Sequence, residues 1–178
     1  MTSLHGVEKL GFALERFDVV VSGRVAFDCG ASTGGFTRAL LDAGASKVYA
    51  VDVGYGQLLG SLRQDERVVA RERTNIATAV TDEPVGVVTL DLSYLSLAKA
   101  LPQLAITLDD GADLLALVKP MFELGLGKLP DDQDAALPDA IALAADAATS
   151  TGWTVVATDR SPVLGNKGAV EGWVHARR

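Results

Sequence analysis

Short apolar runs alternate with amphipathic segments along most of the chain. The apolar runs predict strands that are buried on both faces, at residues 24–28, 47–52, 67–71, 85–91 and 112–119. The segments between and around them predict helices, at residues 6–17, 35–43, 57–64, 97–108 and 135–149. This alternation is typical of an α/β fold, in which helices cover both faces of a mostly parallel sheet.

The C-terminal part departs from this alternation. Two alternating runs, 153–159 and 169–175, are joined by residues 160–168, which do not fit a helix. We expect the two runs to pair as an antiparallel hairpin at the end of a seven-stranded sheet. Gly, Pro and Asp dominate residues 125–134, which predicts a loop.

The composition predicts one globular domain over residues 1–178, with 48% hydrophobic and 22% charged residues. No apolar run approaches the ~20 residues of a membrane span, and the N-terminal residues lack the pattern of a signal peptide. The single cysteine, Cys29, excludes an internal disulfide and is expected to be a small buried side chain. With His5 and His175 far apart, no metal site of the usual spacing can be drawn. We therefore expect a cytoplasmic, metal-free protein.

The formal net charge is −7 at pH 7. A protein that binds nucleic acid by itself usually has a basic face, because phosphate contacts dominate the affinity. A nucleic-acid function would therefore require a local basic patch, an additional domain or a partner.

The turn after the first predicted strand is the most informative local pattern. Asp28 ends that strand, and three glycines, Gly30, Gly34 and Gly35, follow before an amphipathic segment begins. Glycines at such a turn let the backbone come against a ligand, because no Cβ intervenes. Asp52 ends the second predicted strand, where an acid can bind the hydroxyls of a ribose. Together these features predict a site for a nucleoside-containing cofactor.

The glycine spacing indicates which cofactor this is. Dinucleotide folds use G-x-G-x-x-G, whereas this chain has Asp-x-Gly-x-x-x-Gly-Gly. An acid just before the first glycine would repel a diphosphate, but it suits a cationic ligand such as the amino group of S-adenosylmethionine. A tight turn that binds no ligand is the alternative interpretation.

Several longer strings resemble one known family. They are DCGASTGGFT at 28–37, ASKVYAVDVGYGQL at 45–58, ERTN at 72–75, DLSYLSL at 91–97, LVKPMFE at 117–123, and the ending from Ser161-Pro162 to Glu171. On these strings the chain resembles the TlyA, or haemolysin-A-like, family within the FtsJ-like class of S-adenosylmethionine-dependent ribose 2′-O-methyltransferases. The resemblance covers nearly the whole chain and implies the Rossmann-like class I methyltransferase fold, whose last strand is antiparallel.

The resemblance also implies the site residues. The four catalytic residues of the class, which we call the tetrad, correspond to Lys9, Asp91, Lys119 and Glu171. The candidate cofactor-binding residues are Asp28, Gly30, Ser32, Thr33, Gly34, Gly35, Phe36, Asp52, Val53, Asn75 and Asp91. Asp52 is expected to bind the ribose hydroxyls, and Asn75 is expected near the adenine.

The implied reaction is in-line displacement at the sulfonium methyl by a hydroxyl oxygen. A ribose hydroxyl is a very weak acid, so its proton must be taken as the C–O bond forms. Lys119 is the candidate proton acceptor, with Lys9 nearby, and Asp91 and Glu171 would orient the lysines and the hydroxyl. Orientation of the two reactants would supply much of the remaining rate.

Three departures from the family pattern concern the substrate. The N-terminal S4 RNA-binding domain of family members is absent from this sequence. The arginine of the family's Ser-Arg-Gly-Gly-x-Lys-Leu is lost in residues 3–10, and the loop after Glu123 is shortened and carries Asp131 and Asp132. We therefore expect this chain alone to bind RNA weakly, through Lys9, Lys119, Lys128, Lys167 and Arg73.

Three functions stay open from the sequence. The first is ribose 2′-O-methylation of RNA of the rRNA type, with an S4 domain or a partner supplying RNA affinity. The second is methylation of a small hydroxyl compound or a nucleoside, and the third is non-catalytic binding of S-adenosylmethionine. The intact tetrad argues against the third. A continuous basic path to Lys119 would favour RNA, and a closed apolar cavity would favour a small molecule.

Overall fold

A seven-stranded sheet forms the centre of the computed structural model, which describes residues 3–178 and the side chains from residue 5 onward. The strand order is β3-β2-β1-β4-β5-β7-β6. The strands are β1 Val25–Cys29, β2 Lys47–Val51, β3 Val68–Arg71, β4 Val85–Leu90, β5 Leu108–Val118, β6 Thr154–Arg160 and β7 Gly172–Arg177. Strands β1 to β5 are parallel, and β7 is antiparallel to both β5 and β6. The predicted α/β class and the antiparallel C-terminal hairpin are confirmed.

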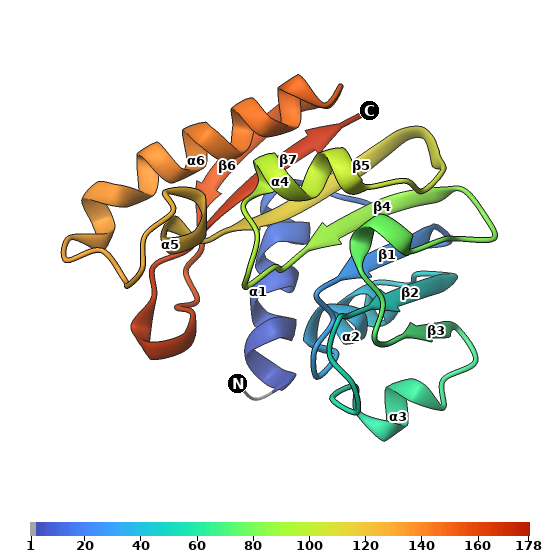
Figure 1. The fold of residues 1–178 in the computed structure, drawn as a ribbon. Helices are drawn as coiled ribbons and strands as arrows, with labels where there is room; N and C mark the ends of the chain where they lie inside the picture. Colours follow the sequence, from blue (N-terminus) through green and yellow to red (C-terminus); the bar gives the residue numbers. More distant parts are fainter. Residues whose placement is uncertain (1–2) are drawn as a thin grey trace.

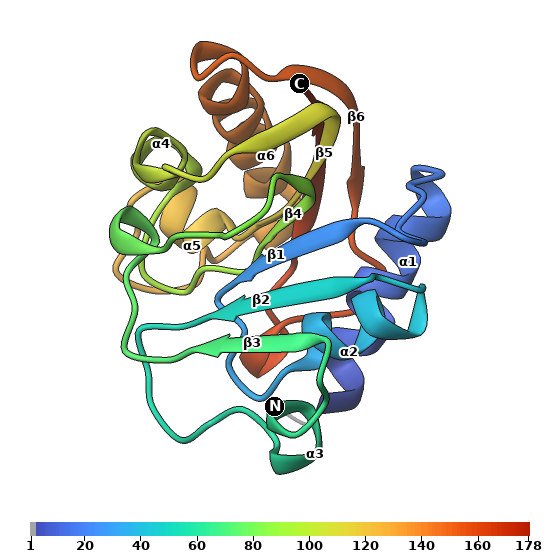
Figure 2. The ribbon, with the colours of Figure 1, turned by 90° about the vertical axis from the view of Figure 1, so that its right-hand side faces the viewer.

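Helices cover both faces of this sheet (Figures 1 and 2). One face carries α1 Ser3–Arg16, α2 Gly35–Asp42 and α3 Gly60–Arg63, and the other carries α4 Leu97–Ala100, α5 Pro120–Glu123 and α6 Gln133–Ser150. Three short 3-10 turns complete the elements, η1 Ile76–Thr78, η2 Leu101–Gln103 and η3 Asn166–Gly168.

The hydrophobic pattern explains why these helices pack where they do. Leu10, Ala13 and Phe17 form the apolar stripe of the α1 segment, and all three are buried in the core on that face of the sheet. On the other face α6 presents small alanines, so the helix lies close to the sheet. A Cβ at Gly172 of β7 would come within 2.7 Å of Ile141 Cδ1, which shows how tightly α6 and β7 pack.

Several predicted boundaries were wrong. The predicted helix 97–108 ends early, because Pro102 lies in a 3-10 turn and residue 108 begins β5 by pairing with Val85. The predicted helix 57–64 is reduced to α3, since Leu59 is extended. The predicted helix 135–149 starts earlier, because the Asp132 side chain accepts a hydrogen bond from Ala135 N and caps α6. The short helix α5 was not predicted.

The strand order reverses between β1 and β4, which are neighbours although β2 and β3 intervene in the sequence. In open α/β sheets, ligands bind outside the carboxyl ends of the strands at this switch point. The glycine turn follows β1, and Asp91 follows β4 directly. The topology therefore brings the two predicted halves of the site together.

Among residues 3–178, no helix has both the length and the apolar character required to cross a bilayer.

Candidate active site

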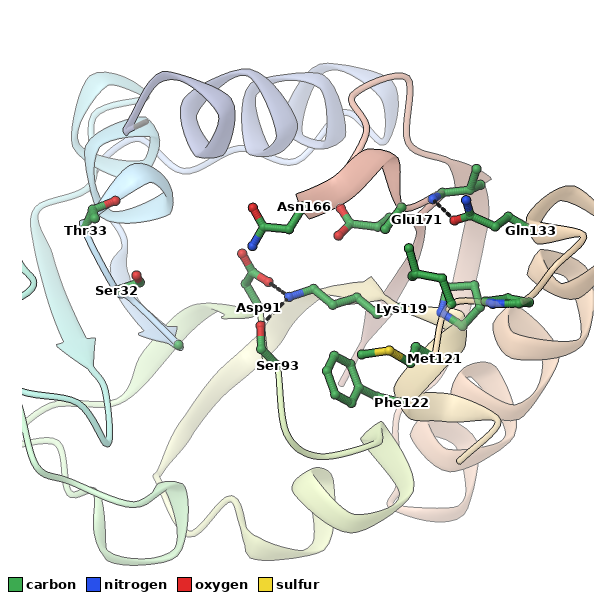
Figure 3. A pocket seen from close by; sticks show the side chains of 16 residues that line it. Ser32, Thr33, Asp91, Ser93, Lys119, Met121, Phe122, Gln133, Asn166 and Glu171 are labelled. Carbon is green, nitrogen blue, oxygen red and sulfur yellow. Dashed lines mark hydrogen bonds and ion pairs between the residues drawn. The ribbon is translucent and has the colours of Figure 1, made fainter. Parts of the chain in front are cut away.

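A cavity of about 350 Å³ opens at the carboxyl ends of β1, β4 and β5 (Figure 3). Its lining residues are Gly30, Ser32, Thr33, Asp91, Ser93, Lys119, Pro120, Met121, Phe122, Leu129, Pro130, Gln133, Asn166, Ala169, Val170 and Glu171. In Figure 3, Ser32 and Thr33 lie on one side of the Asp91–Lys119 pair, and Gln133 and Met121 lie on the other. The cavity thus extends from the glycine turn, past three members of the tetrad, to an apolar end. We call this end, lined by Met121, Phe122, Leu129 and Pro130, the second compartment.

Two glycines fix the shape of the turn. Gly30 has a φ of +89° and Gly34 a φ of +96°, a region that only glycine enters without strain. A Cβ at Gly30 would overlap the Asp91 carbonyl oxygen, and one at Gly34 would overlap Leu62 Cδ1. The turn therefore packs directly against the end of β4, and the first glycine lines the cavity.

Asp52 connects the end of β2 to this turn. Its Oδ2 accepts a hydrogen bond from Ser32 N at 2.8 Å, and its Oδ1 accepts one from Gly54 N at 2.7 Å. The side chain is partly exposed beside the turn rather than in the wall of the cavity. This placement is compatible with the predicted contact to a ribose.

Asp28 lies beneath the turn. Its carboxylate is fully buried and accepts hydrogen bonds from the hydroxyls of Thr37 at 2.6 Å and Thr89 at 3.0 Å. Burial raises its pKa to about 6, although the two threonine hydrogen bonds oppose this. Asp28 therefore joins β1, α2 and β4, and it does not line the cavity.

The other candidate cofactor residues fall into two groups. Gly34, Gly35 and Phe36 are buried at the start of α2, where the Phe36 ring stacks on Trp173 with 5.7 Å between centroids. Val53 and Asn75 follow β2 and β3 and are exposed, and Asn75 Oδ1 accepts a hydrogen bond from Ala77 N. They lie outside the cavity lining, on the neighbouring strand ends.

Asp91 and Lys119 form an ion pair inside the cavity. They follow the adjacent strands β4 and β5, and Lys119 Nζ lies 2.5 Å from Asp91 Oδ1. Lys119 Nζ also donates a hydrogen bond to Ser93 Oγ at 2.9 Å. Their side chains are 16% and 22% exposed, so the pair can reach a molecule in the cavity.

Lys9 and Glu171 form a second pair that is almost completely buried. Lys9 Nζ lies 2.6 Å from Glu171 Oε2. Glu171 lines the cavity, whereas Lys9 contacts it from α1 behind the wall. Burial raises the pKa of Glu171, and the charges of Lys9 and Lys119 oppose this rise. The structure thus brings all four predicted tetrad residues into one region as two ion pairs.

Comparison with known proteins places this fold and site in a family. The sequence profile described as FtsJ-like methyltransferase matches residues 5–178. The chain belongs to the FtsJ-like methyltransferase family. The resemblance inferred from the sequence strings is therefore confirmed.

Individual FtsJ-like relatives cover nearly all of this chain. It is 47% identical over 175 residues to the 16S/23S rRNA (cytidine-2′-O)-methyltransferase TlyA of Mycobacterium tuberculosis, which covers 94% of this chain and 65% of that protein. A solved protein named as a hemolysin of Streptococcus thermophilus has a TM-score of 0.90 and 37% identity, over 97% of this chain and 66% of that chain. An S-adenosylmethionine-dependent methyltransferase of Mesorhizobium loti shares the fold, with a TM-score of 0.67 and 16% identity over 93% of this chain and 96% of that chain. The chain thus spans about two thirds of the length of its TlyA relative.

The second compartment of this FtsJ-like site was not predicted from the sequence. Met121, Phe122, Leu129 and Pro130 form much of its wall. Met121 and Phe122 lie two and three residues after Lys119 in the sequence, and this proximity is a signal that could have found them. Gln133 gave no such signal, because its role depends on long-range contacts. Its Oε1 accepts a hydrogen bond from Val170 N at 2.8 Å, and its Nε2 donates one to Gly168 O at 3.3 Å.

In the described part of the chain, four of the five basic residues predicted to contact RNA already have a partner, and the fifth, Lys167, is exposed. Lys128 pairs with Asp131, and the Arg73 guanidinium stacks on the Tyr55 ring at 4.0 Å. Lys9 and Lys119 are held in the tetrad pairs. Within the described part of the chain, no group of three His, Cys, Asp or Glu side chains is placed to hold a metal ion.

Proposed function

We propose that this chain is an S-adenosylmethionine-dependent methyltransferase that methylates ribose 2′-hydroxyls of RNA, with cytidines of rRNA as its target. The observation that carries the proposal is the Asp91–Lys119 pair, set between the glycine turn and a second compartment. Membership of the FtsJ-like family and the name of the M. tuberculosis relative support the substrate class.

We assign the glycine-turn end of the cavity to the cofactor. Gly30 lines this end of the cavity, and its lack of a Cβ lets the turn pack against the Asp91 carbonyl. Ser32 and Thr33 line the same end of the cavity, and the Asp52 carboxylate lies beside them. When bound, S-adenosylmethionine supplies an electrophilic methyl group on a sulfonium. We assign Asp52 to its ribose and Asn75 to the neighbourhood of its adenine.

Each tetrad residue has a proposed role in the transfer. Once its ammonium has given up a proton, the Lys119 amine accepts the proton of the 2′-hydroxyl, a step that typically contributes about 10²–10⁴-fold in rate. Asp91 and Ser93 fix the position of its amine. Glu171 orients the hydroxyl from the opposite wall, and Lys9 holds the Glu171 carboxylate in place. Positioning the two reactants supplies a further part of the rate.

RNA affinity is expected to be low for this chain by itself. Its net charge is −7, and several of the cations near the cavity are already paired or stacked. Few phosphate contacts imply a shallow salt dependence, because each neutralised phosphate adds about one unit to the slope of log affinity against log salt. An S4-like RNA-binding domain or a basic partner would then supply the missing affinity.

A specific observation favours a second candidate function. The compartment beyond Lys119 has an apolar wall of Met121, Phe122, Leu129 and Pro130, which suits a small hydroxyl compound or a nucleoside. Such an acceptor would use the same tetrad chemistry without needing a basic surface.

One experiment separates the two candidates. The chain, alone and fused to an S4-like domain, is given tritium-labelled S-adenosylmethionine with rRNA or with a metabolite extract, and labelled RNA is digested to nucleosides. We expect 2′-O-methylcytidine, formed much faster by the fusion although its affinity for S-adenosylhomocysteine is unchanged. Methyl transfer only to the metabolite extract would show that the acceptor is a small molecule and not RNA. Tight, steeply salt-dependent RNA binding by the isolated chain would contradict the weak-binding account.

A further inference from the structure

Glu123 makes an unusual contact for a residue next to the site. It is the last residue of α5, the short helix that begins directly after Lys119. Both oxygens of its carboxylate accept a hydrogen bond from Leu97 N, at 2.9 and 3.2 Å. Leu97 is the first residue of α4, and the Ser96 side chain does not cap that helix. Glu123 therefore supplies the cap of α4 from another part of the chain.

This contact joins the segments that carry the ion pair. The segment that starts at Asp91 leads into α4 at Leu97, and the segment that starts at Lys119 leads through α5 to Glu123. The hydrogen bond from Leu97 to Glu123 and the ion pair from Lys119 to Asp91 thus close one ring between the ends of β4 and β5. The two contacts are therefore connected through both segments.

The surroundings of the carboxylate are largely apolar. A small hollow at Glu123 is lined by Leu90, Leu92, Leu95, Leu97, Leu117, Lys119 and Phe122. Lys119 is the charged residue of this set, and its amine is bonded to Asp91 and Ser93 instead. Lys99 of α4 is exposed, and no cation of the described residues forms an ion pair with Glu123. Burial consequently raises the pKa of Glu123 to about 7, and the Leu97 hydrogen bond opposes this only in part.

A carboxylate in such a place is unfavourable for folding. The pKa of Glu123 is above its ordinary value, so the charged form is less stable in the folded chain than in water. A neutral side chain of the same shape would fit this hollow better. Groups that lower stability in this way are typical of functional positions.

We propose that Glu123 is a positioning residue for methyl transfer, and that it holds the Asp91–Lys119 pair in its working geometry through the hydrogen bond to Leu97. The inference rests on the proposed function. A displacement of about 1 Å far from the chemistry can cost ~100-fold in rate. The ionised carboxylate is the stronger acceptor, because charge-assisted hydrogen bonds are about twice as strong as neutral ones. Protonation of Glu123 therefore loosens the ring near neutral pH.

Three variants test the role in transfer. Glu123→Ala removes the acceptor, Glu123→Gln keeps a neutral acceptor of the same length, and Glu66→Gln changes an exposed glutamate as the control. Above pH 7, we expect Glu123→Ala to lower kcat at least about tenfold, with KM for the cofactor unchanged, and Glu123→Gln to lower it only severalfold.

The pH profile supplies the readout that a purely structural role would not move. The ratio of wild-type to Glu123→Gln rates should be close to one at pH 6 and should rise severalfold through pH 7. At higher pH the ratio should stay constant, because groups that titrate equally in both proteins change both rates by the same factor. The Glu66→Gln ratio should be flat. A flat ratio for Glu123→Gln as well, or wild-type kcat in Glu123→Ala, would overturn the inference.

A second measurement does not depend on catalysis. Trace acetylation with acetic anhydride reports how accessible the Lys119 amine is, with exposed Lys167 as the internal reference. We expect Lys119 labelling to rise severalfold in Glu123→Ala and not in Glu66→Gln. Unchanged labelling would reject the ring even if the chain is a methyltransferase. Raised labelling in a chain that methylates no acceptor would support the ring and reject the proposed function.

Discussion

Lys9 of the first helix and Glu171 before the last strand form an ion pair of 2.6 Å with only 1% and 3% of their side chains exposed. Glu171 reaches the cavity wall, so this contact joins the N-terminal helix to the site across almost the whole sequence. Two buried charges are stable only together, because either one alone lacks compensation for its lost hydration.

Breaking this pair should therefore be costly. Lys9→Met leaves the Glu171 carboxylate without its partner, and we expect the free energy of unfolding to fall by about 3–5 kcal/mol. The double variant with Glu171→Gln should recover much of this loss, because no uncompensated charge is left. Urea denaturation of the two single variants and the double variant measures both effects. Additive losses in the double variant would contradict the account.

The turn at Gly30 should not tolerate a side chain. Gly30→Ala places a Cβ on the Asp91 carbonyl oxygen at a φ of +89°, so we expect weaker binding of S-adenosylhomocysteine and lower stability. Gly11→Ala is the matched control, since nothing lies within 4 Å of its Cβ in α1. That control should gain about 0.5–1 kcal/mol from its higher helix propensity. Calorimetry and thermal unfolding compare the pair, and equal behaviour would refute the packing argument.

The parallel strands were predictable because most of them are continuous apolar runs. Residues 85–91 and 112–119, for example, contain β4 and the buried part of β5. Helix boundaries were harder, because they depend on tertiary contacts. The N-terminus of α4 is capped by Glu123 from a different segment, and β5 extends back to residue 108 by pairing with Val85. Neither contact produces a periodic pattern of hydrophobic residues in the sequence.

The site shows the same division. Asp91 and Lys119 could be placed together because both end adjacent parallel strands, and the structure confirms their contact. The burial of Asp28 was not visible in the sequence, since it depends on hydroxyls from α2 and β4. The wall around Gln133 depends on contacts with Gly168 and Val170, more than thirty residues away in the sequence.

Asp52 should control cofactor affinity. Asp52→Ala removes the acceptor proposed for the ribose hydroxyls, and it also frees Ser32 N and Gly54 N from their hydrogen bonds. We expect S-adenosylhomocysteine to bind more weakly by about 1.5–3 kcal/mol, the usual value of hydrogen bonds to a charged group. Asp52→Asn should lose less. Calorimetric titration measures the affinity of both variants. Wild-type affinity in Asp52→Ala would show that Asp52 does not bind the ribose hydroxyls.

Asp28 should make stability depend on pH. Its pKa is about 6 in the folded protein and 3.8 in the unfolded chain, so the folded protein binds the extra proton between these values. The free energy of unfolding should therefore fall as pH rises from about 4 to about 6.

The variant Asp28→Asn tests this dependence. Its amide keeps hydrogen bonds to Thr37 and Thr89, and it carries no buried charge. We expect it to exceed wild-type stability at pH 7 by up to about 3 kcal/mol, and to match wild type below about pH 4. Asp110→Asn, at an exposed position, should show a flat difference. Urea titrations at several pH values measure this. If the difference in free energy of unfolding between Asp28→Asn and wild type did not change with pH, burial would not destabilise the charged Asp28 carboxylate.

The central claim is that Lys119 accepts the proton of the hydroxyl that is methylated. The most direct measurement is the single-turnover rate of methyl transfer by Lys119→Ala at saturating S-adenosylmethionine, beside its affinity for S-adenosylhomocysteine. Lys47→Ala, at the amino end of β2, is the control. We predict a loss of about 100-fold or more in rate, nearly unchanged affinity, and a control that transfers at the wild-type rate. A Lys119→Ala variant that keeps most of the wild-type rate would contradict the account.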